Sequence, residues 1–190
     1  MNSGQRAKWE ERHRGALAGE PEPSVVEMIP LIPRGLALDV AAGSGRNSLA
    51  LARAGIRTVA ADFSETAMST LAAVARRESL PIMPVVADLE ETFPFRANRF
   101  DVILNVSFLC RALVPHLKDA LRIGGVLLFD TFLIDQAESG HPNDPKFLLQ
   151  HYELREILAG MEILRYCEGI VVYASGKRAW RAIALARRVS

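Results

Sequence analysis

Short apolar runs alternate along the chain with longer segments in which apolar positions recur every three or four residues. The runs predict strands, because a strand covered on both faces of a parallel sheet is almost continuously apolar. The longer segments predict amphipathic helices. Strands are expected at residues 36–40, 57–61, 82–87, 100–105 and 125–129, and helices at 47–54, 64–77 and 115–123. This alternation predicts an α/β fold: a doubly wound, mostly parallel sheet with helices on both faces.

The last third of the chain departs from the alternation. Residues 152–159 predict a helix that ends at Gly160, and strands at 162–173 and 178–187 flank a turn at Ser175 and Gly176. The connection is too short for a helical crossover, so these strands are expected to be antiparallel. The polar segment 1–20 predicts a loose helix, followed by a break at 21–23 and a short helix at 25–29. We expect one domain over residues 1–190.

The composition favours a globular protein of the cytoplasm. Hydrophobic residues make up 49% of the chain, and a formal net charge of +1 gives no general attraction to nucleic acid or to an anionic membrane. Cys110 and Cys167 form no metal-binding or disulfide pattern, so reduced thiols are expected. No segment resembles a signal peptide or is long enough to cross a bilayer. A basic cluster near the C-terminus is expected to be a solvated hairpin: Lys177, Arg178, Arg181, Arg187 and Arg188.

Polar side chains stand at the carboxyl ends of the predicted strands: Asp39, Asp62, Asp88, Asn105 and Asp130. The carboxyl ends of parallel strands meet at one edge of a sheet. Ligands of such sheets bind at that edge, near the point where the strand order reverses. The repetition of polar residues there predicts a ligand site.

A glycine-rich loop follows the first strand and opens the next helix. Gly43 and Gly45 permit tight turns and close approach by a ligand, and the helix start offers free backbone N–H groups. Two glycines are also common in ordinary loops. A dinucleotide fingerprint needs a third glycine where Ser48 stands, and the charge of Asp39 on the rim is unfavourable for a diphosphate. S-adenosylmethionine, which carries an ammonium and a sulfonium, suits that carboxylate better.

Two further acids extend this site. Asp62 lies roughly twenty residues past the loop, where a carboxylate can accept both hydroxyls of a ribose. The alternative role for Asp62 is a cap for the helix that begins near Ser64. Asp88 can accept a hydrogen bond from an adenine amine, with Ala87 and Leu89 on either side of the ring. The alternative for Asp88 is an ordinary turn aspartate.

Five segments stand in order along the chain: LDVAAGSGRNSLALA at 38–52, VAADFS at 59–64, VADLE at 86–90, FDVILN at 100–105 and LRIGGVLLF at 121–129. They resemble the motifs of class I S-adenosylmethionine-dependent methyltransferases, and their residues are similar to those of the small tellurite-resistance-type branch. The resemblance implies a seven-stranded sheet with an antiparallel C-terminal strand. Ala41 and Ala42 stand where the family often has Gly-Cys. Residues 168–172 (EGIVV) lack the His-Arg pair of some tellurite-type members, which weakens any assignment to tellurite or selenite chemistry.

The resemblance also implies the cofactor, S-adenosyl-L-methionine, with S-adenosyl-L-homocysteine as its product. Residues 1–22 are expected to cover the cofactor through a Trp-x-x-Arg pattern at Trp9 and Arg12, beside His13. Arg46 stands at a helix N-terminus, which disfavours a cation, so it is expected to pair with the cofactor carboxylate or with Asp39. The expected cofactor-binding set is Trp9, Arg12, Asp39, Ala41, Gly43, Gly45, Arg46, Asn47, Asp62, Phe63, Ala87, Asp88, Leu89 and Asn105.

The acceptor is less narrowly defined. Residues 105–108 (NVSF) lack the Asp/Asn-Pro-Pro-Tyr pattern of enzymes that methylate bases or amides, so a nucleic-acid substrate is not expected. Asp130 and Asp135 are the candidates for a metal, but Asp130 is expected to end the fifth strand, and no metal site is predicted. The candidates for the acceptor pocket are Arg111, His116, Phe132, Tyr152 and Arg181.

We therefore expect methyl transfer by in-line displacement to a small-molecule acceptor, such as a thiol, a metalloid oxyanion or a carboxylate. In such a transfer the protein mainly positions the reactants and excludes water. Two alternatives stay open. One is a nicotinamide-dependent oxidoreductase on a related sheet. The other is a non-catalytic module that keeps the cofactor site without an acceptor pocket, because the sequence offers no obvious catalytic base. The oligomeric state is not indicated.

Overall fold

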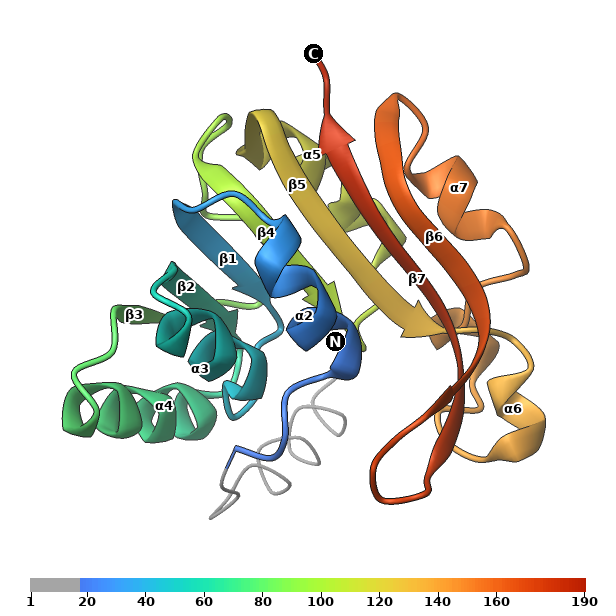
Figure 1. The fold of residues 1–190 in the computed structure, drawn as a ribbon, viewed down its shortest axis with the longest axis horizontal. Coiled ribbons are helices and arrows are strands. Elements are labelled where there is room, and N and C mark those ends of the chain that lie inside the picture. Colours follow the sequence, from blue (N-terminus) through green and yellow to red (C-terminus); the bar gives the residue numbers. More distant parts are fainter. Residues whose placement is uncertain (1–17) are drawn as a thin grey trace.

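A computed structural model describes residues 18–190, which form a seven-stranded sheet in the order β3-β2-β1-β4-β5-β7-β6 (Figure 1). Neighbouring strands from β3 to β5 pair in parallel, whereas β7 runs antiparallel to both β5 and β6. The predicted doubly wound sheet with an antiparallel C-terminal strand is therefore confirmed. The strands are β1 (Leu36–Val40), β2 (Arg57–Asp62), β3 (Ile82–Val86), β4 (Phe100–Val106), β5 (Leu121–Phe132), β6 (Met161–Val172) and β7 (Arg178–Arg188).

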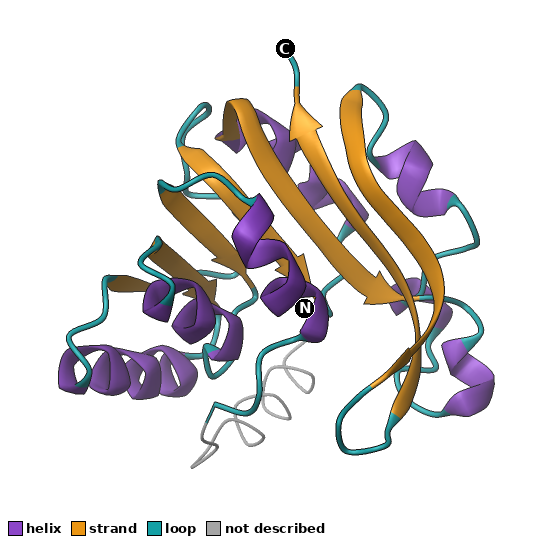
Figure 2. Ribbon diagram, in the orientation of Figure 1, coloured by secondary structure: helices purple, strands orange, loops and turns teal. Residues whose placement is uncertain are grey.

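Helices cover both faces of the sheet (Figure 2). On β1, Ala37 packs with the side chains of α2 (Pro23–Met28) and α3 (Arg46–Arg53), and α4 (Glu65–Arg77) packs beside α3 against β2. Leu38 points to the opposite face, because successive strand residues alternate, and packs with α5 (Val114–Ala120) and α7 (Glu153–Ile157). Shorter elements are η1 (Ile29–Leu31), η2 (Arg111–Leu113), α6 (Gln136–Ser139) and η3 (Pro145–Phe147).

The largest boundary differences concern β5. The helix predicted at 115–123 ends at Ala120, because Leu121 already pairs with Phe100 of β4. Gly124, with a φ of 82°, then lets the strand continue through an irregular stretch. At its other end β5 runs on to Phe132, because it keeps pairing with β7. The prediction that Asp130 ends this strand is therefore wrong: two more strand residues follow it, and it is fully buried.

β1 and β4 lie side by side in the middle of the sheet, and the strand order reverses between them. Val40 pairs with Asn105, so the loop after β1 and the turn after β4 emerge next to each other. This is the crevice where ligands of open α/β sheets bind. Within residues 18–190, no helix combines the length and the apolar character needed to cross a membrane.

Candidate functional site

The loop between β1 and α3 has a backbone that depends on left-handed residues. Gly43 and Gly45 have φ angles of 54° and 81°. A Cβ on Gly45 would lie 2.4 Å from Cδ1 of Leu71, so α4 packs too closely here for any side chain. Ala41 also has a positive φ, 51°, which costs a residue with a Cβ roughly 1–2 kcal/mol. Ala41 is therefore held under strain at a position that favours glycine.

Asp39 is buried beneath this loop and is held by the first turn of α3. The Ser48 hydroxyl donates a hydrogen bond of 2.6 Å to its Oδ2 atom, and both residues are almost fully buried. Burial raises the pKa of Asp39 from its ordinary 3.8 to about 6, although the hydrogen bonds from Ser48 and the charge of Arg46 oppose the rise. Ser48, the residue in place of a third glycine, therefore anchors the helix to the strand.

Asp62 ties the ends of β1 and β2 together. Its Oδ2 atom accepts a hydrogen bond of 2.8 Å from the Gly43 amide, and its Oδ1 atom accepts one of 2.9 Å from the Ser64 amide. The cap of α4 is Ser64, whose hydroxyl accepts from the Ala67 amide. A carboxylate has further lone pairs, so Asp62 can shape the loop and still accept from a ribose. Its contact with a cofactor stays a prediction.

The residues after β3 form a turn beside Asp62. The Ala87 amide donates to the Asp62 carbonyl, and Asp88 accepts from the Glu90 amide at 3.0 Å. Leu89 is buried, and Phe63 is half-buried. Asp88 thus makes the hydrogen bond expected of an ordinary turn aspartate, and its hydrogen bond to an adenine amine stays a prediction.

Arg46 has a partner that the sequence interpretation missed. Its Nη2 atom lies 2.6 Å from Oε2 of Glu22, a carboxylate that is only 2% exposed. The Glu22 amide also donates to the Asn47 side-chain oxygen at 3.0 Å. Of the two expected partners of Arg46, Asp39 is wrong, since it is bonded to Ser48 instead, and the cofactor carboxylate stays a prediction. An acid between two prolines was the available signal for Glu22.

A buried ion pair lies where β4, β5 and β7 meet. Nε of Arg181 donates to Oδ1 of Asp130 at 2.5 Å, and the Ser24 hydroxyl donates to Oδ2 of the same carboxylate. Burial raises the pKa of Asp130, and the charge of Arg181 opposes that rise. Burial alone would lower the pKa of Arg181, but the charges of Asp130 and Glu22 outweigh the effect of burial, and the pKa is raised.

This network extends to Glu22, whose Oε1 atom accepts a hydrogen bond from the Tyr173 hydroxyl and lies 3.9 Å from Nε of Arg181. Glu22 therefore joins the start of α3 to the β6–β7 hairpin across the crevice. Asp130 is fully engaged by Arg181 and Ser24, and no cluster of three metal-ligating side chains occurs in residues 18–190.

The five predicted acceptor-pocket residues do not gather in one place. Phe132 lies under Arg181, whose guanidinium carbon is 4.4 Å from the ring centroid. Arg111 forms a two-pronged ion pair with Glu153 on α7, with a shortest distance of 2.5 Å. His116 is exposed and stacks on Phe93, and Tyr152 is 65% exposed.

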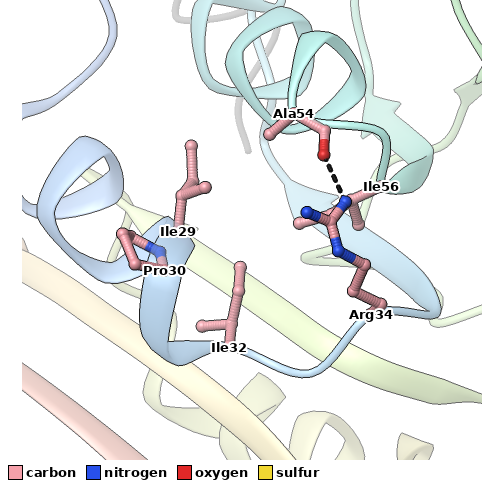
Figure 3. A pocket seen from close by; sticks show the side chains of 6 residues that line it. All are labelled: Ile29, Pro30, Ile32, Arg34, Ala54 and Ile56. Carbon is pink, nitrogen blue, oxygen red and sulfur yellow. Dashed lines mark hydrogen bonds between the residues drawn. The ribbon is translucent and has the colours of Figure 1, made fainter.

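Trp9, Arg12 and His13 lie outside the described residues. A cavity of about 430 Å³ is lined by residues of η1, the following loop and the end of α3 (Figure 3). Arg34 lines one side of it and donates from Nη1 to the Ala54 carbonyl at 2.6 Å. The cavity adjoins the segments that lead into β1 and β2, so it lies at the sheet edge opposite the crevice.

Comparison with known proteins adds family information to this geometry. Residues 37–125 match the protein family described as a methyltransferase domain. No curated protein sequence matches the chain.

Among solved structures, the chain resembles TehB from Haemophilus influenzae, with a TM-score of 0.76 and 24% identity over 88% of this chain, and it spans 62% of that protein. A SAM-dependent methyltransferase from Methanosarcina mazei matches with a TM-score of 0.72 and 17% identity, covering 90% of this chain and 99% of that one. A protein solved for the conversion of a disulfide bond into a thioacetal group during echinomycin biosynthesis matches with a TM-score of 0.71 and 24% identity, covering 90% and 83%.

Proposed function

We propose that this chain transfers the methyl group of S-adenosylmethionine to a small-molecule acceptor. The match of residues 37–125 to a methyltransferase domain supports the proposal, and so does the fold shared with TehB and with a SAM-dependent methyltransferase. The arrangement that carries the proposal is the loop between β1 and α3, closed by Asp62 through the Gly43 amide and anchored by Asp39 through Ser48. When bound, S-adenosylmethionine supplies an electrophilic methyl group on a sulfonium.

The donors and acceptors around the crevice fit that cofactor. Gly45, the N-cap residue of α3, supplies no side-chain cap, so the backbone N–H groups of Arg46 and Asn47 at the positive dipole end suit a carboxylate. Asp62 retains lone pairs for the hydroxyls of a ribose. Ala87 and Leu89 offer apolar atoms beside Asp88 for an adenine ring. These features support a cofactor site formed by the loop after β1, Asp62 and the turn after β3.

A small acceptor is supported by the way the crevice is bridged. Glu22 contacts both Arg46 and Tyr173 and is itself buried, so side chains of the protein itself bridge the crevice here. The NVSF segment at 105–108 lacks the motif associated with methylation of bases and amides. A reducing compartment such as the cytoplasm fits the two cysteines, neither of which is in a disulfide.

Isothermal titration calorimetry on the purified chain tests the cofactor. We expect S-adenosylmethionine and S-adenosylhomocysteine to bind and NADH not to bind. Tight NADH binding without binding of either adenosyl compound would overturn the proposal. Methyl transfer is then followed with tritiated cofactor and a panel of thiols, oxyanions and carboxylic acids. Micromolar cofactor affinity with no transfer to any acceptor would instead identify a binding module.

A further inference from the structure

We propose that Ser107 positions the acceptor and that the group it receives is a carboxylate, which makes the acceptor a small carboxylic acid. The inference rests on the proposed function and names its substrate class. Ser107 belongs to none of the predicted site residues. Three features of Ser107 support this role: its place in the sheet, its contact with Arg181 and its backbone conformation.

Ser107 follows the last residue of β4 and lies at the mouth of the crevice. Its amide donates to the carbonyl of Asp130 on β5 at 2.7 Å, and on the other side β4 pairs with β1 through Asn105 and Val40. The residue is exposed although the five residues before it are buried. Ser107 is therefore a polar group that the sheet presents to the ligand side, beside the loop after β1.

The Ser107 hydroxyl is oriented from below by a buried cation. Nη2 of Arg181 donates to its Oγ atom at 3.0 Å and also to the Asp130 carbonyl at 3.2 Å. Arg181 is 1% exposed, and the Asp130 carboxylate fixes it in place. Because Oγ accepts from the guanidinium, the hydroxyl proton is directed away from Arg181 and toward the open side. A hydroxyl that accepts from a cation is also a stronger donor.

The backbone at Ser107 is strained. Its φ of 57° lies in the left-handed region, which a residue with a Cβ seldom adopts. Two hydrogen bonds hold it there. The Ser107 backbone N–H donates to the Asp130 carbonyl, and the Asn105 side-chain amide donates to the Phe108 carbonyl at 2.7 Å. Strain of this kind persists where surrounding contacts enforce it, and it concentrates at functional sites. The turn thus holds the hydroxyl in one direction.

A carboxylate is the acceptor that this arrangement favours. One of its oxygens can accept from Ser107 while the other attacks, since each oxygen has its own lone pairs. In that transfer an O–C bond forms as the S–C bond breaks, the charges of carboxylate and sulfonium cancel, and no proton is released. An amine or alcohol must lose a proton, yet in residues 18–190 Arg181 is the one ionisable side chain that bonds to the Ser107 hydroxyl. A thiolate needs no base either, but it has one sulfur atom, so it cannot accept from Ser107 through one atom and attack through another as a carboxylate can.

The test is binding of carboxylate probes to the full chain saturated with S-adenosylhomocysteine, followed by NMR at the Ser107 and Phe108 amides. Acetate and benzoate are titrated beside acetamide and benzamide, which have the same shape without the charge. We expect saturable shifts with the two carboxylates and none with the amides. Ser107→Ala is expected to weaken carboxylate binding about tenfold, the loss of one hydrogen bond to a charged group. Equal responses to acid and amide, or no saturable response to acetate, would overturn the inference.

Two further variants separate the hydroxyl from the backbone. Ser79→Ala is the matched control, because Ser79 is also exposed with a left-handed φ of 53° but follows α4, and it should leave carboxylate binding unchanged. Ser107→Gly removes the hydroxyl and relieves the strain, and it should lose binding as Ser107→Ala does. Retained binding in the glycine variant would refute a role for the hydroxyl. Calorimetry with S-adenosylhomocysteine on the same sample reports on the proposed function separately.

Discussion

Ser48 and Asp39 form a buried hydrogen bond of 2.6 Å that fastens the first turn of α3 to the central strand β1. From the sequence, Asp39 is expected to face a positively charged ligand, and Ser48 stands where a dinucleotide-binding fingerprint has its third glycine. Together they are one structural unit beneath the loop. Burial raises the pKa of Asp39 to about 6, so this carboxyl also couples the stability of the fold to pH.

Asp39→Asn is expected to change that coupling. A carboxyl with a raised pKa in the folded protein holds its proton more tightly there than in the unfolded chain. Its stabilising effect is therefore complete below about pH 4 and is lost as the pH rises to about 6. An asparagine has no such loss. The free energy of unfolding of Asp39→Asn, relative to the wild type, should thus increase by about 1–3 kcal/mol between pH 4 and pH 7.5.

Urea unfolding at a series of pH values measures this difference. Asp119→Asn, at an exposed position on α5, is the control variant. Both variants share all other titrating groups with the wild type, so these cancel in the comparison. If the difference in the free energy of unfolding between Asp39→Asn and the wild type stayed constant across this pH range, burial would not raise the pKa of Asp39.

Asp62→Ala is expected to weaken binding of S-adenosylmethionine by about 1–3 kcal/mol, the scale of hydrogen bonds that involve a charged group. The change removes the predicted acceptor for the ribose and also the partner of the Gly43 amide. Asp62→Asn separates these effects, because its side-chain oxygen can still accept from Gly43. Calorimetric titration gives the affinities. Unchanged affinity in both variants would remove Asp62 from the cofactor site.

The parts of this fold that could be predicted are those that depend on local pattern. β1 and β4 are almost continuously apolar runs, and Gly43 and Gly45 mark the loop that their left-handed φ angles shape. The partners of charged side chains could not be predicted in this way. Glu22 and Tyr173 are 151 residues apart, and hydrophobic periodicity gives the face on which a residue lies without naming its partner.

Ser107 illustrates the same limit within the site. In the sequence it marks only the absence of a known motif. Its significance depends on a left-handed φ and on Arg181, which arrives from β7 through an antiparallel pairing. Arg111 shows the converse: the sequence made it a candidate for the acceptor pocket, but its partner is Glu153 of the protein itself.

Gly45→Ala is expected to destabilise the fold by about 2–4 kcal/mol. The new Cβ would meet the fully buried Leu71 at 2.4 Å, and the φ of 81° is unfavourable for alanine. Gly176→Ala in the β6–β7 turn is the matched control, since its φ is 78° and no atom lies within 4 Å of the added Cβ. It should cost about 1–2 kcal/mol from the backbone alone. Thermal unfolding compares the two variants, and equal losses would mean that Leu71 moves aside without cost.

Glu22→Gln is expected to destabilise the protein by about 1–3 kcal/mol, because it leaves part of a buried charge network without its counter-charge. Glu22 is 2% exposed and faces Arg46, Arg181 and Tyr173, so its negative charge offsets two guanidinium groups. Glutamine keeps the shape and can still accept from the Tyr173 hydroxyl, which confines the change to the charge. Glu20→Gln, two residues earlier at an exposed position, should change stability by less than about 0.5 kcal/mol. Urea denaturation at pH 7 measures both variants, and a loss in Glu22→Gln no larger than that in Glu20→Gln would show that Arg46 and Arg181 do not depend on this carboxylate.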